Sequence, residues 1–114
     1  MELRDYPAGK TAFYSFDVSG IPRAVILLVH GLGEHAARYA GWAERFNEMG
    51  VALRAFDLPG HGRTEGRWGV VPSPGKVFDT IDTLLVEIGR DFPKLPVFLY
   101  GHSLGGGIVL NYLI

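Results

Sequence analysis

The sequence contains no cysteine, which excludes disulfides, thiolate metal sites and cysteine nucleophiles. It also lacks an excess of charge of one sign, because 11 Lys and Arg residues face 12 Asp and Glu residues, so a nucleic-acid-binding module is not expected. No hydrophobic run is long enough to span a bilayer, since the longest covers only residues 24–29. The charged start, from Met1 to Asp5, is followed by no apolar signal segment, and these absences together favour a cytoplasmic location.

What the sequence does have is the composition of a globular domain. Hydrophobic residues make up 47% and charged residues 20% of the 114 positions, which excludes a disordered polar chain. This length predicts one domain at most, with a single modest core. Glycine is frequent, with 16 residues, and several of these lie in short clusters between apolar segments.

Apolar segments alternate along the chain as strands and helices. Strands are predicted at residues 11–18, 24–29, 51–56 and 97–100, and helices at residues 36–49, 76–92 and after residue 101. The alternation predicts an α/β fold in which a mostly parallel sheet has helices on both faces. Sites in such sheets form at the carboxyl ends of the strands, where three loops are expected here, at residues 30–35, 57–66 and 101–104.

The last of these loops carries the pattern G-x-S-x-G. The residues are Gly101-His102-Ser103-Leu104-Gly105, directly between an apolar strand and an apolar helix. This context is that of a nucleophile elbow, a strained turn that presents its serine above the sheet. Side chains two residues to either side would collide with neighbouring backbone, and glycine at these positions removes them. Ser103 is therefore the predicted nucleophile, with Gly101, His102 and Gly105 supporting the turn.

The loop after the longest apolar run is predicted to stabilise an oxyanion. Acyl transfer needs donors aimed at the developing oxyanion, and in this arrangement they are two backbone amides, one from this loop and one from the residue after the nucleophile. The sequence thus predicts the amides of Leu32 and Leu104. Gly31 and Gly33 let the loop fold tightly, and His30 is interpreted as an anchor of the loop rather than as a base. A G-x-G-x-x-G pattern is absent from the loop, which argues against a dinucleotide, and no cofactor is expected.

Three segments together resemble the α/β-hydrolases, specifically the monoacylglycerol lipase and lysophospholipase group. Residues 30–35 match the group's His-Gly-x-Gly-Glu-His loop. Residues 57–66 match its Asp-x-x-Gly-His-Gly-x-Ser-Glu-Gly segment, with Thr64 in place of the serine. Residues 96–106 match its Pro-x-Phe-Leu-x-Gly-His-Ser-x-Gly-Gly segment. The resemblance implies hydrolysis of a carboxylic ester, with a small acyl ester or a lipid as substrate.

The same resemblance implies roles for individual residues. It makes Ser103 the nucleophile that forms an acyl-serine intermediate, with the oxyanion held by the amides of Leu32 and Leu104. Serine needs a base, and the base needs an orienting acid, and in this fold both follow the nucleophile in the chain. Residues 104–114 contain no Asp, Glu or His. The sequence therefore predicts that residues 1–114 are the amino-terminal part of one α/β-hydrolase domain, without its later strands, cap, triad acid and triad base.

Other polar residues leave alternatives open. His35 and His61 are expected on loops at the correct edge of the sheet and could act as a base, although structural roles are favoured for both. Asp57 follows a strand, where a triad acid can lie, but it is interpreted as tying the loop that follows it. A metal site made by these three residues and His30 fits by residue type, but their spacing matches no known ligand pattern and no metal is expected.

Two functional hypotheses follow. The first is the front part of a serine ester hydrolase, active when the rest of the fold is supplied. The second is a catalytically incomplete unit that acts as a folding, binding or self-associating module. In both cases the strand from Val97 to Tyr100 has an unpaired apolar edge, because further strands of this fold lie on its far side. The isolated chain is therefore expected to self-associate through that edge.

Overall fold

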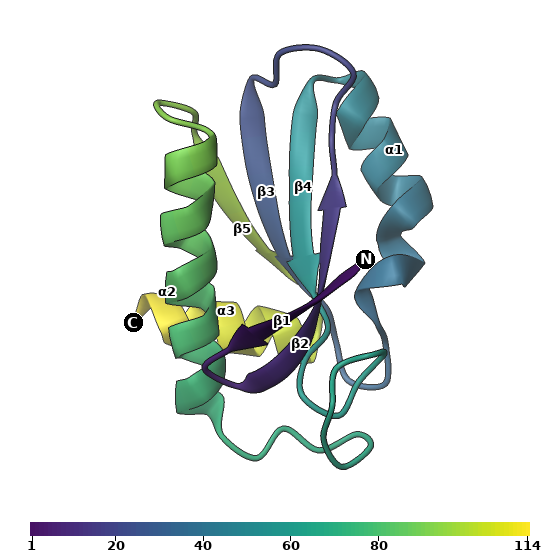
Figure 1. Cartoon of the computed structure of the whole chain (residues 1–114), viewed down its shortest axis with the longest axis vertical. Coiled ribbons are helices and arrows are strands. Elements are labelled where there is room, and N and C mark those ends of the chain that lie inside the picture. The colour runs from purple at the N-terminus through teal and green to yellow at the C-terminus, as the bar shows by residue number, and fades with distance from the viewer.

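The computed structural model describes all 114 residues as one mixed sheet with helices on both faces (Figure 1). The strands are β1 (Glu2–Tyr6), β2 (Gly9–Phe16), β3 (Ala24–Val29), β4 (Val51–Phe56) and β5 (Val97–Gly101). The helices are η1 (Ala36–Tyr39), α1 (Ala40–Glu48), α2 (Pro74–Asp91) and α3 (Leu104–Leu113). The sheet order is β1-β2-β4-β3-β5, in which β3 runs parallel to both β4 and β5, while β1 and β2 are antiparallel. The predicted α/β fold class is confirmed.

The core lies on both faces of β3, whose six residues are all buried. Val25, Leu27 and Val29 face the core that α2 and α3 cover, whereas Ile26 and Leu28 face the smaller core beneath α1. This division follows from the period of two in a strand, and only a strand covered on both faces can be apolar throughout. The helices lie on opposite sides of the sheet in Figure 1. None of them combines the length and apolar composition needed to cross a membrane.

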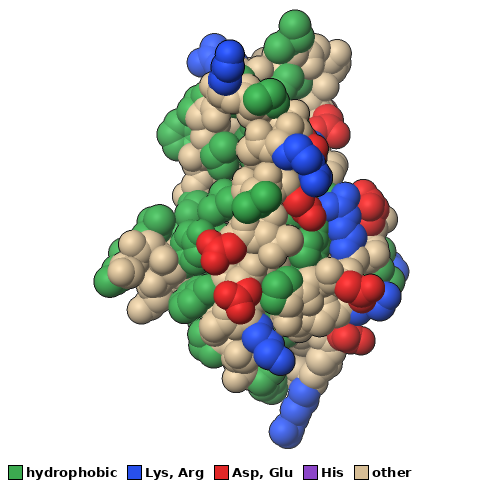
Figure 2. Space-filling model, turned by 60° about the vertical axis from the view of Figure 1, so that its left-hand side comes forward, with side chains coloured by type: hydrophobic (Ala, Val, Ile, Leu, Met, Phe, Trp, Pro, Cys, Tyr) green, Lys and Arg blue, Asp and Glu red, His purple; other side chains and the backbone are tan.

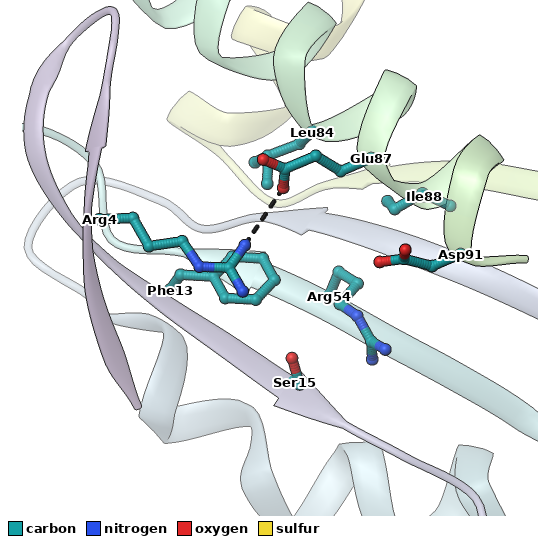
Figure 3. Close-up of a pocket in the computed structure, with 8 residues that line it drawn as sticks. All are labelled: Arg4, Phe13, Ser15, Arg54, Leu84, Glu87, Ile88 and Asp91. Atoms are coloured by element: carbon teal, nitrogen blue, oxygen red, sulfur yellow. Dashed lines mark hydrogen bonds and ion pairs between the residues drawn. The ribbon is translucent and has the colours of Figure 1, made fainter.

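The amino-terminal strand β1 was not predicted, because its charged residues hide the strand pattern. It pairs with β2 across the two-residue turn Pro7-Ala8. Its Arg4 stacks over the ring of Phe13, 4.0 Å from the ring centroid, and donates to Glu87 of α2 at 3.2 Å. Figure 3 shows Arg4 and Glu87 meeting across a small polar pocket of about 160 Å³ between the sheet and α2. Charged residues therefore join this hairpin to the helix.

The helix predicted at residues 36–49 is present in two parts. Its first turn, η1, is a 3-10 helix, and the α-helix proper begins at Ala40. Ala36 is pinned at its amide by the buried carboxylate of Asp57, with a donor–acceptor distance of 2.6 Å. A contact with a residue distant in sequence therefore constrains this first turn. The local spacing of apolar residues could not predict that contact.

Strand β5 forms one edge of the sheet, as expected, and it pairs only with β3. Val97 and Phe98 are exposed, and a wholly apolar groove of about 320 Å³ lies beside them, lined by Ala24, Ile26, Phe46, Val51, Phe98, Leu99 and Tyr100. Leu110, Leu113 and Ile114 of the neighbouring α3 region are exposed as well. Figure 2 shows a flank of the molecule on which hydrophobic side chains predominate over charged ones.

We predict that the 114-residue chain associates with itself through β5, because an unpaired apolar strand edge is a template for another strand. Light scattering at micromolar concentration should show species larger than a monomer, and Phe98→Lys should shift them toward the monomer. Val86→Lys places the same charge on the exposed face of α2, where the valine is 72% exposed, and should leave the association unchanged. A stable monomer of the unaltered chain would contradict this prediction.

Candidate active site

Ser103 lies at a sharp turn between β5 and α3, in a backbone conformation that serine rarely adopts. Its φ is 55° and its ψ is −116°, and Lys94 is the only other residue besides glycine with a positive φ. Such a conformation costs about 1–3 kcal/mol and persists only where the surroundings impose it. The turn is held by the amide of His102, which donates to the carbonyl of Val29 at 3.1 Å. The predicted strand–turn–helix context is therefore present.

The surroundings that impose this turn are close contacts between backbones. A Cβ atom at Gly105 would overlap the carbonyl groups of Val29 and His30, and one at Gly101 would overlap the backbone of Gly105. Across the turn, a Cβ at Gly31 would lie 3.2 Å from the Cβ of Ser103. The structure thus brings the loop after β3 into direct contact with the predicted nucleophile.

The Leu32 amide has a fixed direction, because its peptide plane is held at the carbonyl end. The carbonyl of Gly31 accepts hydrogen bonds from the Glu34 amide at 3.2 Å and from Nδ1 of His30 at 2.7 Å. The carbonyl and the Leu32 N–H belong to one trans peptide unit, so they point in opposite directions. The Leu32 amide donates to no backbone carbonyl, and Gly33 continues the turn with a φ of 74°. The Leu32 amide is therefore unpaired, and it follows Gly31, the residue that packs against Ser103.

His30 makes a hydrogen bond at each ring nitrogen, one within this loop and one to Leu58. The Leu58 amide donates to its Nε2 at 2.9 Å, so that nitrogen carries no proton and Nδ1 is the donor to Gly31. The ring is completely buried. Burial lowers the pKa of His30 below its ordinary value of 6.5, and this outweighs the opposite influence of Gly31 and Asp57. The neutral imidazole is thus the form that the fold requires.

A pH dependence of stability follows from the state of His30. The unfolded chain binds a proton at this histidine near pH 6.5, while the folded chain does so only at lower pH. The contribution of neutral His30 to the free energy of unfolding is therefore complete above pH 6.5. It is lost as the pH falls through the lowered pKa, by at most about 1.4 kcal/mol per pH unit. Urea unfolding at pH 7.5 and 5.5 should show this loss, and His30→Gln should reduce it. His35→Gln, on the exposed part of the same loop, should not. An equal pH dependence in all three proteins would contradict the assignment.

Asp57 ties the loop that follows it, as interpreted from the sequence. Its completely buried carboxylate accepts from the hydroxyl of Tyr14 at 3.0 Å, the amide of Ala36 at 2.6 Å and the amide of Arg63 at 3.0 Å. A Cβ at Gly62 would overlap that carboxylate. The residue thus joins β2, η1 and the glycine-rich loop into one support beneath the site.

The carboxylate of Glu34 is a site feature that sequence reasoning missed. It is almost completely buried and accepts from the amide of Gly31 at 3.1 Å and from the hydroxyl of Tyr39 at 2.8 and 2.9 Å. Its Oε1 also lies 3.1 Å from Nδ1 of His102, the residue before Ser103. The available signal in the sequence was an acidic residue within a short glycine-rich loop.

No base lies next to Ser103. Its side chain is exposed and takes part in none of the side-chain hydrogen bonds, and the ring of His102 faces Glu34 instead. His61 is buried, with Nδ1 donating to the carbonyl of Pro59 at 3.0 Å, while Nε2 has no partner. His35 is exposed. The structure therefore places Gly31 against Ser103, and none of the four histidines is hydrogen-bonded to that serine.

A groove opens beside Leu104, at the start of α3. It has a volume of about 510 Å³ and is lined by Pro74, Phe78, Leu104, Gly107, Ile108 and Asn111. Phe78, Leu104 and Ile108 contribute the hydrophobic part of this lining. At the amino-terminal end of α3, the amides of Gly105 and Gly107 donate to the carbonyls of His102 and Ser103, and this end carries the positive end of the helix dipole.

Comparison with known proteins agrees with this geometry. The family model for serine aminopeptidase, S33, matches residues 20–114. The chain belongs to this family of α/β-hydrolases. It is 41% identical over 91 residues to a monoacylglycerol lipase of Mycolicibacterium smegmatis, covering 80% of this chain and 32% of that protein. It is 42% identical over 93 residues to the monoglyceride lipase of Rattus norvegicus, covering 79% and 30%.

Solved structures of α/β-hydrolases show the same fold. A soluble variant of the monoglyceride lipase from Saccharomyces cerevisiae, in complex with a substrate analog, superposes with a TM-score of 0.83 at 28% identity. The match covers 97% of this chain and 38% of that one. The resemblance to the monoacylglycerol lipase group is thereby confirmed. The chain spans about a third of the length of the curated relatives it matches.

Proposed function

We propose that this chain carries the nucleophile and the oxyanion amides of a serine hydrolase that cleaves carboxylic esters. The observation that carries the proposal is the backbone of Ser103, held at φ 55° and ψ −116° between β5 and α3 while Gly31 packs against its side chain. A serine in a strained turn at the carboxyl end of a parallel strand is the arrangement of a nucleophile elbow. The family to which the chain belongs supports a serine nucleophile, and the monoacylglycerol lipase relatives support an ester substrate.

In this mechanism Ser103 attacks the carbonyl carbon of the ester. The Oγ–carbon bond forms as a base accepts the hydroxyl proton, and the negative charge moves to the carbonyl oxygen. The amides of Leu32 and Leu104 donate to this oxyanion, a contribution typically worth about 3–4 kcal/mol per donor. The alcohol then leaves with the proton, and water hydrolyses the acyl-serine to release the acid and the free serine.

The base and its orienting acid are proposed to come from outside these 114 residues. The chain spans about a third of its relatives, and α/β-hydrolases order their triad as serine, acid, histidine. None of the four histidines lies in hydrogen-bond contact with Ser103, whereas His30, His61 and His102 have other partners. We therefore propose that residues 1–114 are the amino-terminal portion of one α/β-hydrolase domain.

The proposed substrate is a monoacylglycerol, a lysophospholipid or a related acyl ester. Two of its relatives are a monoacylglycerol lipase and a monoglyceride lipase, at 41% and 42% identity. The groove beside Leu104 adds a local argument, because Phe78 and Ile108 offer apolar surface next to a predicted oxyanion amide.

Ser103→Ala should abolish hydrolysis of short acyl esters by the protein, reducing turnover by about three orders of magnitude or more. The matched control is Ser15→Ala, which removes an exposed hydroxyl from β2 and should leave turnover unchanged. Hydrolysis of a chromogenic butyrate ester would measure both. Activity retained in Ser103→Ala would place the nucleophile elsewhere.

A further inference from the structure

The carboxylate of Glu34 is the point at which the oxyanion loop and the nucleophile elbow are joined. On the loop side it accepts from the Gly31 amide at 3.1 Å. On the elbow side it lies 3.1 Å from Nδ1 of His102. Tyr39 and Arg38 hold the same carboxylate from η1, with the nearest distances at 2.8 and 3.3 Å. Side chains and backbone from three separate segments thus meet at one buried acid.

This acid is ionised in the folded protein. Burial alone would raise the pKa of Glu34, but hydrogen bonds from Tyr39, Gly31 and His102 outweigh burial and hold the pKa below its ordinary value. An ionised carboxylate only accepts hydrogen bonds, and every partner here is a donor. Bonds to a charged acceptor are also about twice as strong as bonds between neutral groups. The connection that Glu34 makes between the oxyanion loop and the nucleophile elbow is therefore stronger than an ordinary contact between two loops.

The two groups that Glu34 holds lie one and two residues before the predicted oxyanion amides in the chain. Gly31 immediately precedes Leu32, and its carbonyl is already fixed by His30, so holding its amide restrains the loop on both sides of that residue. His102 precedes Ser103 and Leu104. A Cβ at Gly31 would lie 3.0 Å from the carbonyl of His102, so the two segments touch where Glu34 joins them.

We propose that Glu34 is a positioning residue that fixes the oxyanion loop against the nucleophile elbow and so sets the spacing of the Leu32 and Leu104 amides. This inference rests on the proposed function, since the spacing matters only if these amides bind an oxyanion. Glu34 itself touches neither Ser103 Oγ nor the predicted oxyanion position through any hydrogen bond. It acts through Gly31 and His102.

Hydrogen–deuterium exchange of the full chain tests the join without requiring activity. Glu34→Gln replaces a charged acceptor with a neutral one and should speed exchange about tenfold at the Gly31 amide, because a bond to a neutral acceptor is weaker. His102→Ala removes the elbow end alone, from a ring that is 54% exposed, and should also speed exchange in residues 30–34. Glu44→Gln, an exposed acid on α1, is the matched control and should change nothing.

The variant at His102 separates positioning from a merely local role. If Glu34 only stabilises its own loop, His102→Ala will leave exchange in residues 30–34 unchanged, and the proposal is then wrong. That variant also keeps the test decisive if Glu34→Gln fails to fold, because the exposed ring contributes little to the core.

Labelling kinetics with a fluorophosphonate test the catalytic consequence. In both variants the maximal rate of serine labelling should fall about tenfold, while the probe concentration for half-maximal rate stays the same. These rates are measured on the protein at its natural length, which supplies the proposed base. If that unaltered protein is not labelled but the exchange results hold, the contact through Glu34 stands and the proposed function fails. If labelling is normal in both variants, Glu34 does not position the oxyanion amides.

Discussion

Gly105→Ala should destabilise the protein by at least about 3 kcal/mol, the upper part of the range for overpacking a close-packed site. The new methyl group would overlap the carbonyl groups of Val29 and His30, which are backbone atoms of a fully buried strand and of its anchored loop. Neither can withdraw without breaking the β3 pairing or the loop support. Because small domains are stable by only about 5–15 kcal/mol, much of the total would be lost. Urea unfolding followed by circular dichroism measures this directly.

Gly107→Ala is the matched control for that experiment. It lies two residues further along α3, and a Cβ there meets no atom within 4 Å. Alanine stabilises a helix interior by up to about 1 kcal/mol relative to glycine, so this variant should be equally stable or more stable. If both variants behaved alike, the close approach of α3 to β3 at the elbow would be refuted.

Asp57→Asn should cost about 3 kcal/mol of unfolding free energy, the second large effect. The substitution keeps the shape but turns one carboxylate oxygen into an NH₂ group, which would face either the Ala36 amide or the Tyr14 hydroxyl and Arg63 amide. A donor facing a buried donor loses the bond and leaves both groups unsatisfied, at about 1–3 kcal/mol for each group. Chemical denaturation is again the measurement.

Asp79→Asn serves as the control for Asp57→Asn, since Asp79 lies exposed on α2 and its carboxylate makes no hydrogen bond or ion pair. Its free energy of unfolding should stay within about 0.5 kcal/mol of the unaltered protein. A small effect at Asp57 as well would mean that the carboxylate does not bind the three segments together.

The elements that were predicted well are those in which the environment in the fold restricts the residue types of the element itself. The run at residues 24–29 is apolar at every position because β3 is covered on both faces, and this gave the parallel core. The turn at Ser103 was recognised because glycine is needed where α3 approaches β3, and that requirement is local in sequence. Where a fold constrains residue type at fixed spacing, the sequence predicts it.

The features that were missed depend on contacts between distant residues. Strand β1 reads as a charged segment, and it is held by Arg4 reaching Glu87, which lies 83 residues away. Glu34 reads as one polar residue in a loop, and its significance comes from His102, which lies 68 residues away. The side chain of Asp57 likewise bonds the amide of Ala36, 21 residues earlier. Periodicity and local motifs carry no information about such partners.

The most direct test of the central claim is to find which residue a fluorophosphonate labels. Such a probe reacts with a serine that is activated for attack, and it should be applied in an extract in which the protein is present at its natural length. Digestion and mass spectrometry then identify the labelled peptide. We predict that the adduct is on Ser103, in the segment between β5 and α3, and that Ser103→Ala removes it. An adduct on another residue, or none at all, would contradict the assignment of Ser103 as the nucleophile.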